Sequence, residues 1–528
     1  MTHPKLVEAM SNPEFYPQKS QGVELIQTHI SYIFIAGDYV YKVKKAVDFG
    51  FLDFTTLEKR RHYCNEELRL NRRLAREIYL SVVEICEDAD GNLFLGKGAG
   101  AVEYAVKMKR LPRERMLSTL LPEGKVDKSI MKPVARKMVD FHENAATGGE
   151  IDIIGGVETI RKNHDENFEQ TGPYINITIP ENSCRFIRSY IYRFMEEQLP
   201  LLKKRVADHR IRDCHGDLHI EHICITDDIL IFDCIEFNER FRYSDVAAEV
   251  AFLAMDLDYN GYPDYADSFK NHYIKYSGDD EINTLLNFYK CYYACVRGKV
   301  TSFRIDDEAI PEEERKKAAG TALRYFDLAY TYAARLEKPA LILVAGLTGT
   351  GKSVLAKNMA PRLGAEIIRS DILRKEILNI YPTERHYEDF GKGIYTDDIS
   401  RKTYQRALDL AEEKLIEGES VIIDASYKDR DERIKAADAA DRLNAGFFVI
   451  ECVCPDEIIK KRLNSRMADV DEASDGRWEI FQAQKDRFDE ITEVQKITID
   501  TSLTEEESTR KAIEEISKLK TNREKNQN

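Results

Sequence analysis

Hydrophobic and polar positions change their spacing along the chain, and the change separates two regions. Between residues 339 and 505, short apolar runs alternate with amphipathic segments, which is typical of a parallel sheet covered by helices on both faces. The runs are at 340–345, 365–371, 420–426, 447–455 and 496–500, and helices are expected at 398–417 and 429–442. We therefore expect an α/β domain whose crossovers are right-handed.

The first 330 residues follow a different pattern. Two β-rich runs flank Gly37-Asp38, which predicts a hairpin. A helix is expected from His62 to Leu74, because its apolar residues recur at helical spacing. Further strands are expected at 80–87, 92–95 and 103–109, and mainly helices follow, with an aromatic-rich helical stretch from 259 to 336. This order predicts an α+β domain.

A charged turn ending in Pro339 is the best boundary between the two regions. We expect one domain at residues 1–336 and a second at 339–505. Residues 506–528 are rich in charge and are expected to form a helical or disordered tail.

Composition narrows the class of protein. The chain has 528 residues, and no apolar run approaches the ~20 residues of a membrane span. A net charge of −15 argues against binding of extended nucleic acid. Ten scattered cysteines, including Cys452-x-Cys454, are expected to be reduced thiols. With no secretion signal recognisable at the start, we expect a cytoplasmic protein without a membrane partner, while its oligomeric state stays open.

The most specific motif follows the apolar run 340–345. It reads Gly-x-x-x-x-Gly-Lys-Ser and precedes a helical segment, the context expected for a phosphate-binding loop. Backbone N–H groups of such a loop surround an anion at a helix N-terminus. The expected nucleotide-binding residues are Gly346, Thr348, Gly349, Thr350, Gly351, Lys352 and Ser353. Lys352 would reach the β- and γ-phosphates of ATP, and Ser353 would complete the shell of Mg²⁺.

Two carboxylates follow neighbouring strand candidates of this region. Asp371 and Asp424 are expected at the carboxyl edge of the sheet, where ligands of such folds bind. We expect Asp371 to accept a proton from a substrate hydroxyl, although a helix N-cap is an equal alternative. Arg374 is expected to bind the substrate, and Asp424 to hold the metal.

Two arginines further on complete this set. Arg462 and Arg466 share one helix face and are suited to phosphate oxygens. The Asp371-x-x-Arg374 and Arg462-x-x-x-Arg466 motifs resemble the polynucleotide-kinase and zeta-toxin group of P-loop kinases, over about residues 339–505. The resemblance implies transfer of the ATP γ-phosphoryl group to a hydroxyl.

A second chemical centre begins at His215-Gly-Asp217-Leu-His219. Two apolar runs after it predict a hairpin around residues 226–228, with Asp233 at its far end. Asp217 and Asp233 could therefore converge on one cleft, where one carboxylate orients a hydroxyl and the other holds magnesium.

This stretch resembles the aminoglycoside phosphotransferase branch of the protein-kinase-like fold, over about the first 330 residues. The resemblance implies Asp217 as catalytic base, Asp233 as magnesium ligand, Lys42 on the phosphates and Glu67 as the partner of Lys42. It also implies that Asp245 braces the catalytic loop. By its strand position alone, Lys42 would more often be an edge lysine than a phosphate ligand.

The sequence departs from that family at two points. His222 stands where the family has a metal-binding Asn, and no Gly-x-Gly-x-x-Gly precedes Lys42. A neutral imidazole binds divalent metals but is a softer ligand than an amide oxygen. His215, His219 and His222 also allow a zinc site, but the two aspartates favour phosphoryl transfer.

We therefore expect a bifunctional ATP-dependent phosphotransferase that uses Mg²⁺ and an unidentified hydroxyl-bearing acceptor. The first alternative is a P-loop kinase regulated by an N-terminal pseudokinase that senses nucleotide or ligand. The second is a kinase of nucleic-acid ends or nucleotide sugars. The sequence identifies neither acceptor.

Overall fold

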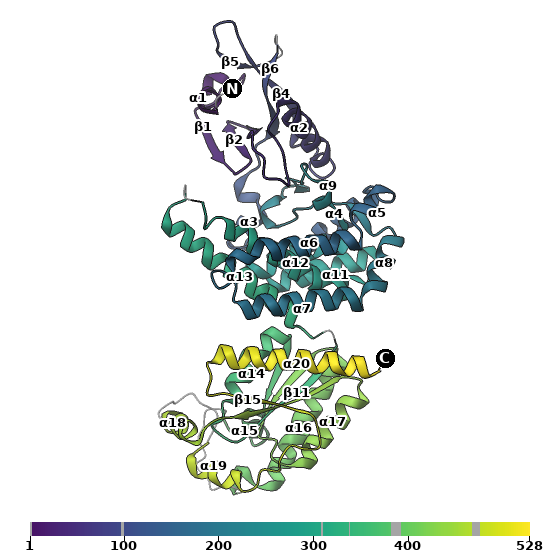
Figure 1. Cartoon of the computed structure of the whole chain (residues 1–528), viewed down its shortest axis with the longest axis vertical. Coiled ribbons are helices and arrows are strands. Elements are labelled where there is room, and N and C mark those ends of the chain that lie inside the picture. Colours follow the sequence, from purple (N-terminus) through teal and green to yellow (C-terminus); the bar gives the residue numbers. More distant parts are fainter. Residues whose placement is uncertain are drawn as a thin grey trace. The chain divides into compact units, whose positions relative to one another are not determined.

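The structure of the protein is a computed structural model, which describes residues 3–96, 100–307, 310–336, 338–381, 392–466 and 476–527. Contacts within the chain divide it into two compact units, Met1–Ala329 and Tyr330–Asn528. The division lies inside helix α13 (Glu312–Ala334), slightly before the turn at Pro339. Each unit is described by itself (Figure 1).

Unit 1 begins with a six-stranded sheet in which every neighbouring pair is antiparallel. The strand order is β1-β2-β3-β6-β4-β5. The strands are β1 (Val23–Gln27), β2 (Ser31–Ala36), β3 (Tyr39–Lys44), β4 (Tyr79–Glu87), β5 (Leu93–Leu95) and β6 (Ala101–Lys109). The predicted hairpin is confirmed, because β2 pairs with β3 across Gly37, whose φ is 62°.

The two faces of β3 have different neighbours. Tyr41 and Val43 are fully buried in an apolar cluster that includes residues of α1 (His3–Ser11). Lys42 and Lys44 alternate with them and therefore point to the opposite face. Helix α2 (Leu57–Asn71), capped by the Thr56 side chain, packs on that face against β4 and β6. The alternation thus brings two lysines towards α2.

The rest of unit 1 is mainly helical, with two short β-ladders between the helices. Its helices of five or more residues are α4 (Met131–Asn144), α5 (Glu150–Ile154), α6 (Val157–Thr171), α7 (Glu181–Glu197), α8 (Leu199–Ala207), α10 (Val246–Tyr259), α11 (Pro263–Ser277), α12 (Ile282–Phe303) and α13. The ladders pair β7 (Ile211–Asp213) with β10 (Tyr243–Asp245), and β8 (Ile223–Ile225) with β9 (Ile229–Ile231). The hairpin predicted after the His-Gly-Asp motif is confirmed.

Unit 2 contains a five-stranded sheet in which all strands are parallel. The order is β12-β13-β11-β14-β15. The strands are β11 (Ala340–Ala345), β12 (Ala365–Arg369), β13 (Ser420–Asp424), β14 (Gly446–Val453) and β15 (Lys496–Asp500). Leu341 and Leu343 pack with α16 (Asp397–Ile416) and α17 (Arg430–Arg442) in one cluster. This confirms the predicted fold class of a parallel α/β domain joined to an α+β domain.

The other face of this sheet is covered by α14 (Lys352–Leu363) and α20 (Glu505–Gln527), which lie beside each other (Figure 1). Ala512, Ile513 and Ile516 of α20 are buried. The segment expected as a charged tail is therefore a helix that shares the core of unit 2. No described helix is long and apolar enough to cross a membrane.

Candidate active sites

The phosphate-binding motif of unit 2 forms a tight loop between β11 and α14. Gly346, Gly349 and Gly351 have φ values of 135°, 78° and 88°, in the region that disfavours residues with a Cβ atom. A Cβ on Gly349 would lie 2.9 Å from the side chains of Ile459 and Leu463. Lys352 Nζ donates to the Leu347 carbonyl at 2.8 Å. At these three glycine positions the backbone conformation and the close packing leave no room for a larger residue.

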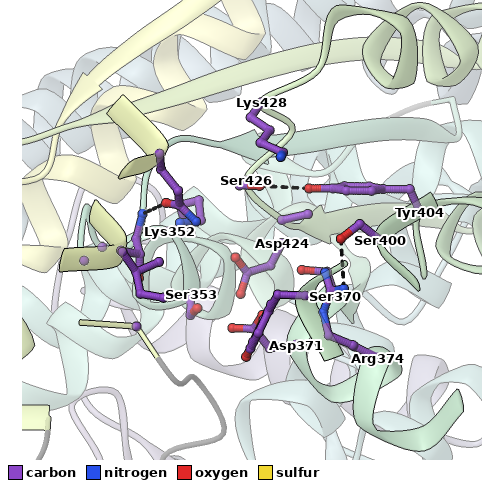
Figure 2. A pocket seen from close by; sticks show the side chains of 18 residues that line it. Lys352, Ser353, Ser370, Asp371, Arg374, Ser400, Tyr404, Asp424, Ser426 and Lys428 are labelled. Carbon is purple, nitrogen blue, oxygen red and sulfur yellow. Dashed lines mark hydrogen bonds between the residues drawn. The ribbon is translucent and has the colours of Figure 1, made fainter. Parts of the chain in front are cut away.

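Three side chains beside the loop form a site suited to a divalent cation. Figure 2 shows Asp371 and Asp424 facing the same space as Ser353. Burial raises the pKa of Asp424, and the nearby Lys352 and Ser353 side chains oppose that rise. A hydroxyl and a carboxylate are oxygen ligands of the kind Mg²⁺ prefers, so the residues present fit the predicted metal site.

Asp371 lies at the start of a helix rather than at the end of a strand. Strand β12 ends at Arg369, and Asp371 is in the first turn of α15 (Ser370–Ile377). The N-cap of α15 is Arg369, so the capping alternative for Asp371 is wrong. Arg369 pairs with Asp424 in the register of the sheet, which explains why Asp371 and Asp424 meet.

Further polar residues line this pocket that the sequence did not single out. Figure 2 shows Ser370, Ser400, Tyr404, Ser426 and Lys428 among them, and Tyr395 and Gln484 also line the pocket. Arg374, which was predicted, also lines it and donates to the Ser400 hydroxyl and the Ile394 carbonyl at 3.1 Å each. Ser400 and Tyr404 are four residues apart on α16, but Ser370, Tyr395, Ser426 and Lys428 come from separate helix starts and loops that no spacing rule links.

The structure does not place Arg462 in the pocket. Its guanidinium donates to Thr501 Oγ1 at 3.1 Å, and Thr501 Oγ1 donates to the Thr350 carbonyl at 2.6 Å. Arg462 therefore supports the back of the phosphate loop instead of pointing at phosphates. Arg466 ends α18 (Asp456–Arg466), and its side chain lies outside the described residues.

In unit 1, Lys42 reaches its predicted partner Glu67 and also Asp233, which was predicted only as a metal ligand. Its Nζ lies 3.0 Å from Glu67 Oε1 and 2.6 Å from Asp233 Oδ1. Lys44 Nζ lies 2.7 Å from the other oxygen of Glu67 and also pairs with Glu236. Glu67 is fully buried, so one carboxylate is shared between two lysines. Lys44 and Glu236 were missed, although the two-residue spacing from Lys42 placed Lys44 on the same face.

The His-Gly-Asp turn is held by a buried acid. The backbone N–H groups of His215 and Gly216 donate to Glu249 at 2.8 and 2.7 Å. Glu249 in turn contacts His142 Nε2 at 2.7 Å. Asp245, the expected brace, instead caps α10 and pairs with Arg205 at 2.7 Å. Gly216 has a φ of 86°, and a Cβ there would lie 3.0 Å from the Phe241 carbonyl.

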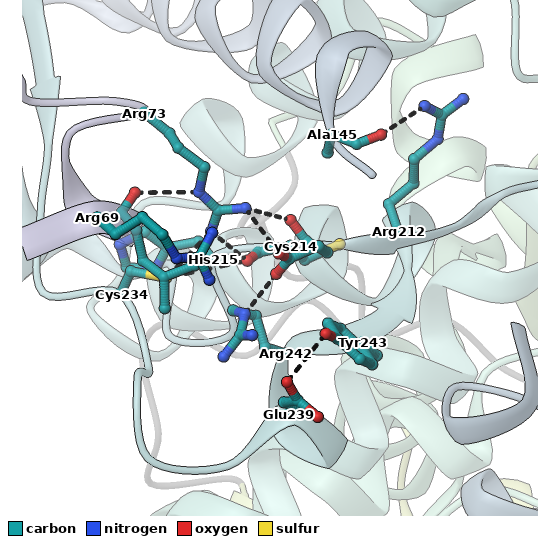
Figure 3. Close-up of polar contacts among 12 residues, drawn as sticks. Arg69, Arg73, Ala145, Arg212, Cys214, His215, Cys234, Glu239, Arg242 and Tyr243 are labelled. Atoms are coloured by element: carbon teal, nitrogen blue, oxygen red, sulfur yellow. Dashed lines mark hydrogen bonds and ion pairs between the residues drawn. The ribbon is translucent and has the colours of Figure 1, made fainter. Parts of the chain in front are cut away.

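Two arginines fix the strand that leads into this turn (Figure 3). Arg73, which follows α2, donates to the carbonyls of Asp213 and Cys214 at 2.8 and 3.0 Å. Arg242 pairs with the Asp213 carboxylate. The segment before His215 is therefore tied to the end of the helix that carries Glu67.

Asp217 and Asp233 lie on two sides of one imidazole. His222 Nδ1 lies 3.6 Å from Asp217 Oδ2, and His222 Nε2 lies 3.6 Å from Asp233 Oδ2. His222 Nδ1 also contacts the Asp217 carbonyl at 2.9 Å, so Nδ1 carries the hydrogen and Nε2 offers a lone pair. Burial and His219 lower the pKa of His222, which is thus neutral. A lone pair facing a carboxylate fits a cation between them, as predicted for His222 and Asp233.

Asp233 and Asp217 are both held as carboxylates. Burial opposes ionisation, but the ammonium of Lys42 holds the pKa of Asp233 below its ordinary value. His219 does the same for the pKa of Asp217. Asp233 has a φ of 63°, uncommon for a residue other than glycine, and such strain is often found at functional sites.

The three-histidine zinc site is not assembled. His215 Nε2 donates to the Phe232 carbonyl at 2.9 Å, while its Nδ1 accepts from the Asp217 N–H at 3.3 Å. Both nitrogens of His215 are thus occupied, and burial lowers its pKa to about 4. Asp217, His219 and His222 do lie within ligand distance of a common point.

Comparison with known proteins supports the assignment of the P-loop domain. Residues 341–491 match the family described as AAA domain. Three curated relatives, uncharacterized proteins of Mycobacterium bovis and Mycobacterium tuberculosis, are each 29% identical over 445 residues, or 84% of this chain and 86% of theirs. Since that stretch is longer than either unit, the similarity extends into both.

Solved structures show more distant likeness. A choline/ethanolamine kinase family protein from Mesorhizobium loti is 12% identical, with a TM-score of 0.36 over 62% of this chain and 99% of its own. The aminoglycoside 2'-phosphotransferase-IIIa in its GDP complex is 14% identical, with a TM-score of 0.38 over 60% and 98%. A gluconokinase from Sinorhizobium meliloti is 20% identical, with a TM-score of 0.26 over 35% and 95%. At these values the likeness says nothing about substrates.

Proposed function

We propose that the chain is a bifunctional ATP-dependent phosphotransferase, in which each unit transfers the γ-phosphoryl group of ATP to a hydroxyl of a small molecule or nucleotide. The observation that carries this proposal is the convergence of Lys42, Asp217 and Asp233 on one cleft of unit 1, with His222 between the two carboxylates. These groups can hold phosphates, a divalent cation and an acceptor hydroxyl together, as phosphoryl transfer requires.

In unit 1, each residue has one role in this proposal. Asp217 Oδ2 accepts the proton of the acceptor hydroxyl as that oxygen bonds to the γ-phosphorus and ADP leaves. Lys42, oriented by Glu67, binds phosphate oxygens, while Asp233 and His222 would hold Mg²⁺. The bound cation would supply charge neutralisation for the phosphates.

In unit 2, the backbone of residues 346–351 and Lys352 would bind the phosphates, with Ser353 and Asp424 holding Mg²⁺. Asp371 takes the proton of the acceptor, and Arg374 orients that acceptor across the pocket. The proposal rests on the shared space of these side chains in Figure 2 and on the family match.

The test is phosphate transfer by the full chain from γ-labelled ATP to a panel of hydroxyl compounds. Lys42→Met and Lys352→Met should each remove transfer to a different subset of acceptors, and the double variant should remove all of it. Transfer that persists in the double variant would refute both sites.

One observation favours a second candidate for unit 1. Lys42 is directly paired with Asp233, the expected metal ligand, at 2.6 Å. A site of this kind could bind nucleotide to regulate unit 2 without transferring phosphate. In that case the same panel would show transfer that depends on Lys352 alone.

A further inference from the structure

The cleft of unit 1 extends well beyond the catalytic groups. It has a volume of about 900 Å³, larger than the phosphate-transfer groups need. Helices α6 and α12, which contact each other, line its far part. Phe49 and Phe51, both nearly half exposed and stacked on each other, also line the cleft. A cavity of this size accommodates a small molecule of several rings or a substituted sugar.

A lysine in this far part has no anionic partner. Lys299 Nζ of α12 donates to the amide oxygens of Asn167 at 2.6 Å and Gln170 at 2.9 Å. No described carboxylate lies within 4.0 Å of its Nζ. Burial lowers the pKa of Lys299 to about 8 because it disfavours the charged ammonium, and the more distant Glu166 offsets this cost only in part. An anion beside it would remove that cost.

Each described carboxylate of the far part already has a partner, including Asp307, which also lines the cleft. Glu166 receives two hydrogen bonds from Arg240, at 2.9 and 2.7 Å. Asp245 is paired with Arg205 at 2.7 Å. Arg297 lines the cleft too, without an ion pair to a described carboxylate within 4.0 Å. The described residues of the far part therefore leave positive charge available to an anionic ligand. Their carboxylates, which already have partners, do not offer the same to an amine.

Two deeply buried polar atoms elsewhere along the same cleft lack hydrogen-bond partners among the described residues. His164 Nε2 and the Tyr289 hydroxyl form no hydrogen bond with any described residue. The two residues are only 2% and 4% exposed, and both line the cleft. Burial lowers the pKa of His164 to about 3, so its ring is neutral. Buried groups of this kind are normally satisfied, and hydroxyls of a ligand would satisfy them.

We propose that the acceptor bound by unit 1 is a small hydroxyl compound carrying an oxyanion, a carboxylate or a phosphate, with Lys299 holding the anion and His164 and Tyr289 bonding to its hydroxyls. Only the claim that this ligand accepts a phosphoryl group rests on the proposed function. The ligand site itself stands on the charge and the unpartnered groups of the cleft.

The test is calorimetric binding to the full chain carrying Lys352→Ala, which disables the phosphate loop of unit 2. Four probes share one ring: glucose, glucosamine, glucuronate and glucose 6-phosphate. We expect at least one anion to bind about tenfold or more tightly than glucose, with glucosamine weakest, because a charge-assisted bond adds that much. The comparison of glucuronate with glucose 6-phosphate shows whether the site prefers a carboxylate or a phosphate. Equal or stronger binding of glucosamine, or no measurable anion binding at millimolar concentration, would overturn the proposal.

Variants localise the site. Lys299→Gln should remove the preference for the anion, whereas Lys203→Gln, an exposed lysine of α8, should leave it unchanged. Tyr289→Phe removes only a hydroxyl without partners, so the fold should tolerate it while every ring probe binds about fivefold more weakly. If Lys299→Gln does not fold, the affinities of the ring probes for Tyr289→Phe test the site. Unchanged affinity in both variants contradicts the site.

These binding measurements contain no ATP, so they separate the two claims. Anion binding that depends on Lys299 without phosphate transfer would leave the ligand class standing and refute the transfer. Transfer by unit 1 to amines or neutral sugars alone would refute the ligand class and leave the transfer standing.

Discussion

Replacing Glu67 by Gln tests the shared carboxylate at the centre of unit 1. Glu67 is fully buried and lies 3.0 Å from Lys42 Nζ and 2.7 Å from Lys44 Nζ. Removing one member of a buried ion pair costs about 3–5 kcal/mol, because a charge is left uncompensated. Each lysine keeps a second carboxylate, in Asp233 and Glu236. We therefore expect the lower end, about 3 kcal/mol of the free energy of unfolding.

The assay is urea unfolding of the full chain followed by circular dichroism. With a slope of about 3 kcal/mol per molar urea for a large domain, the midpoint of unit 1 should fall by about 1 M. The matched control is Glu87→Gln, since the Lys5–Glu87 pair is 43% and 37% exposed. Exposed pairs contribute about 0–1 kcal/mol. If Glu67→Gln shifts the midpoint no more than Glu87→Gln, the shared carboxylate does not stabilise the unit.

Three further predictions concern both units. Asp217→Asn should keep nucleotide binding by unit 1 and lose transfer, whereas Asp233→Asn should lose binding, as calorimetry with and without Mg²⁺ will show; the reverse pattern would exchange their roles. Gly349→Ala should weaken ATP binding by unit 2 at least tenfold, because its Cβ would collide with Leu463; normal binding would mean that the loop is not closely packed. Arg433 lowers the pKa of Glu493 to about 2 although burial raises it. At neutral pH, Glu493→Gln should therefore lower the free energy of unfolding by about 3 kcal/mol. Fluorescence of Trp478, the single tryptophan, measures the unfolding. Because the pKa of Glu493 is lower in the folded than in the unfolded protein, its charge stabilises the fold at pH values above the unfolded pKa. The difference in stability between the wild type and Glu493→Gln should therefore shrink between about pH 4 and pH 2. A difference that stays constant would contradict the ion pair.

A motif could be predicted where one short stretch of sequence contains both the chemical groups and the residues that set the backbone conformation. The loop 346–353 needs glycine at positive φ, and it follows a buried strand. Lys42, Asp217 and Asp233 were predicted from a family resemblance, and they meet because a hairpin and a strand lead into one cleft.

The residues that were missed are held by contacts between distant segments. Glu249 binds the turn at His215 from a helix more than 30 residues away, and Lys299 meets Asn167 from another helix. Arg462 is predicted to bind phosphates because guanidinium suits them, but Thr501, just after the last strand, holds its side chain elsewhere. The sequence predicts a tail in place of α20 because its many charged residues mask one apolar stripe, Ala512, Ile513 and Ile516.

The central claim is that the chain has two separate nucleotide sites, and the stoichiometry of ATP binding by the full chain with Mg²⁺ tests it most directly. We predict two ATP molecules per chain, one in each of the single variants Lys352→Ala and Asp233→Ala, and none in the double variant. A stoichiometry of one that Asp233→Ala leaves unchanged would contradict the account of unit 1.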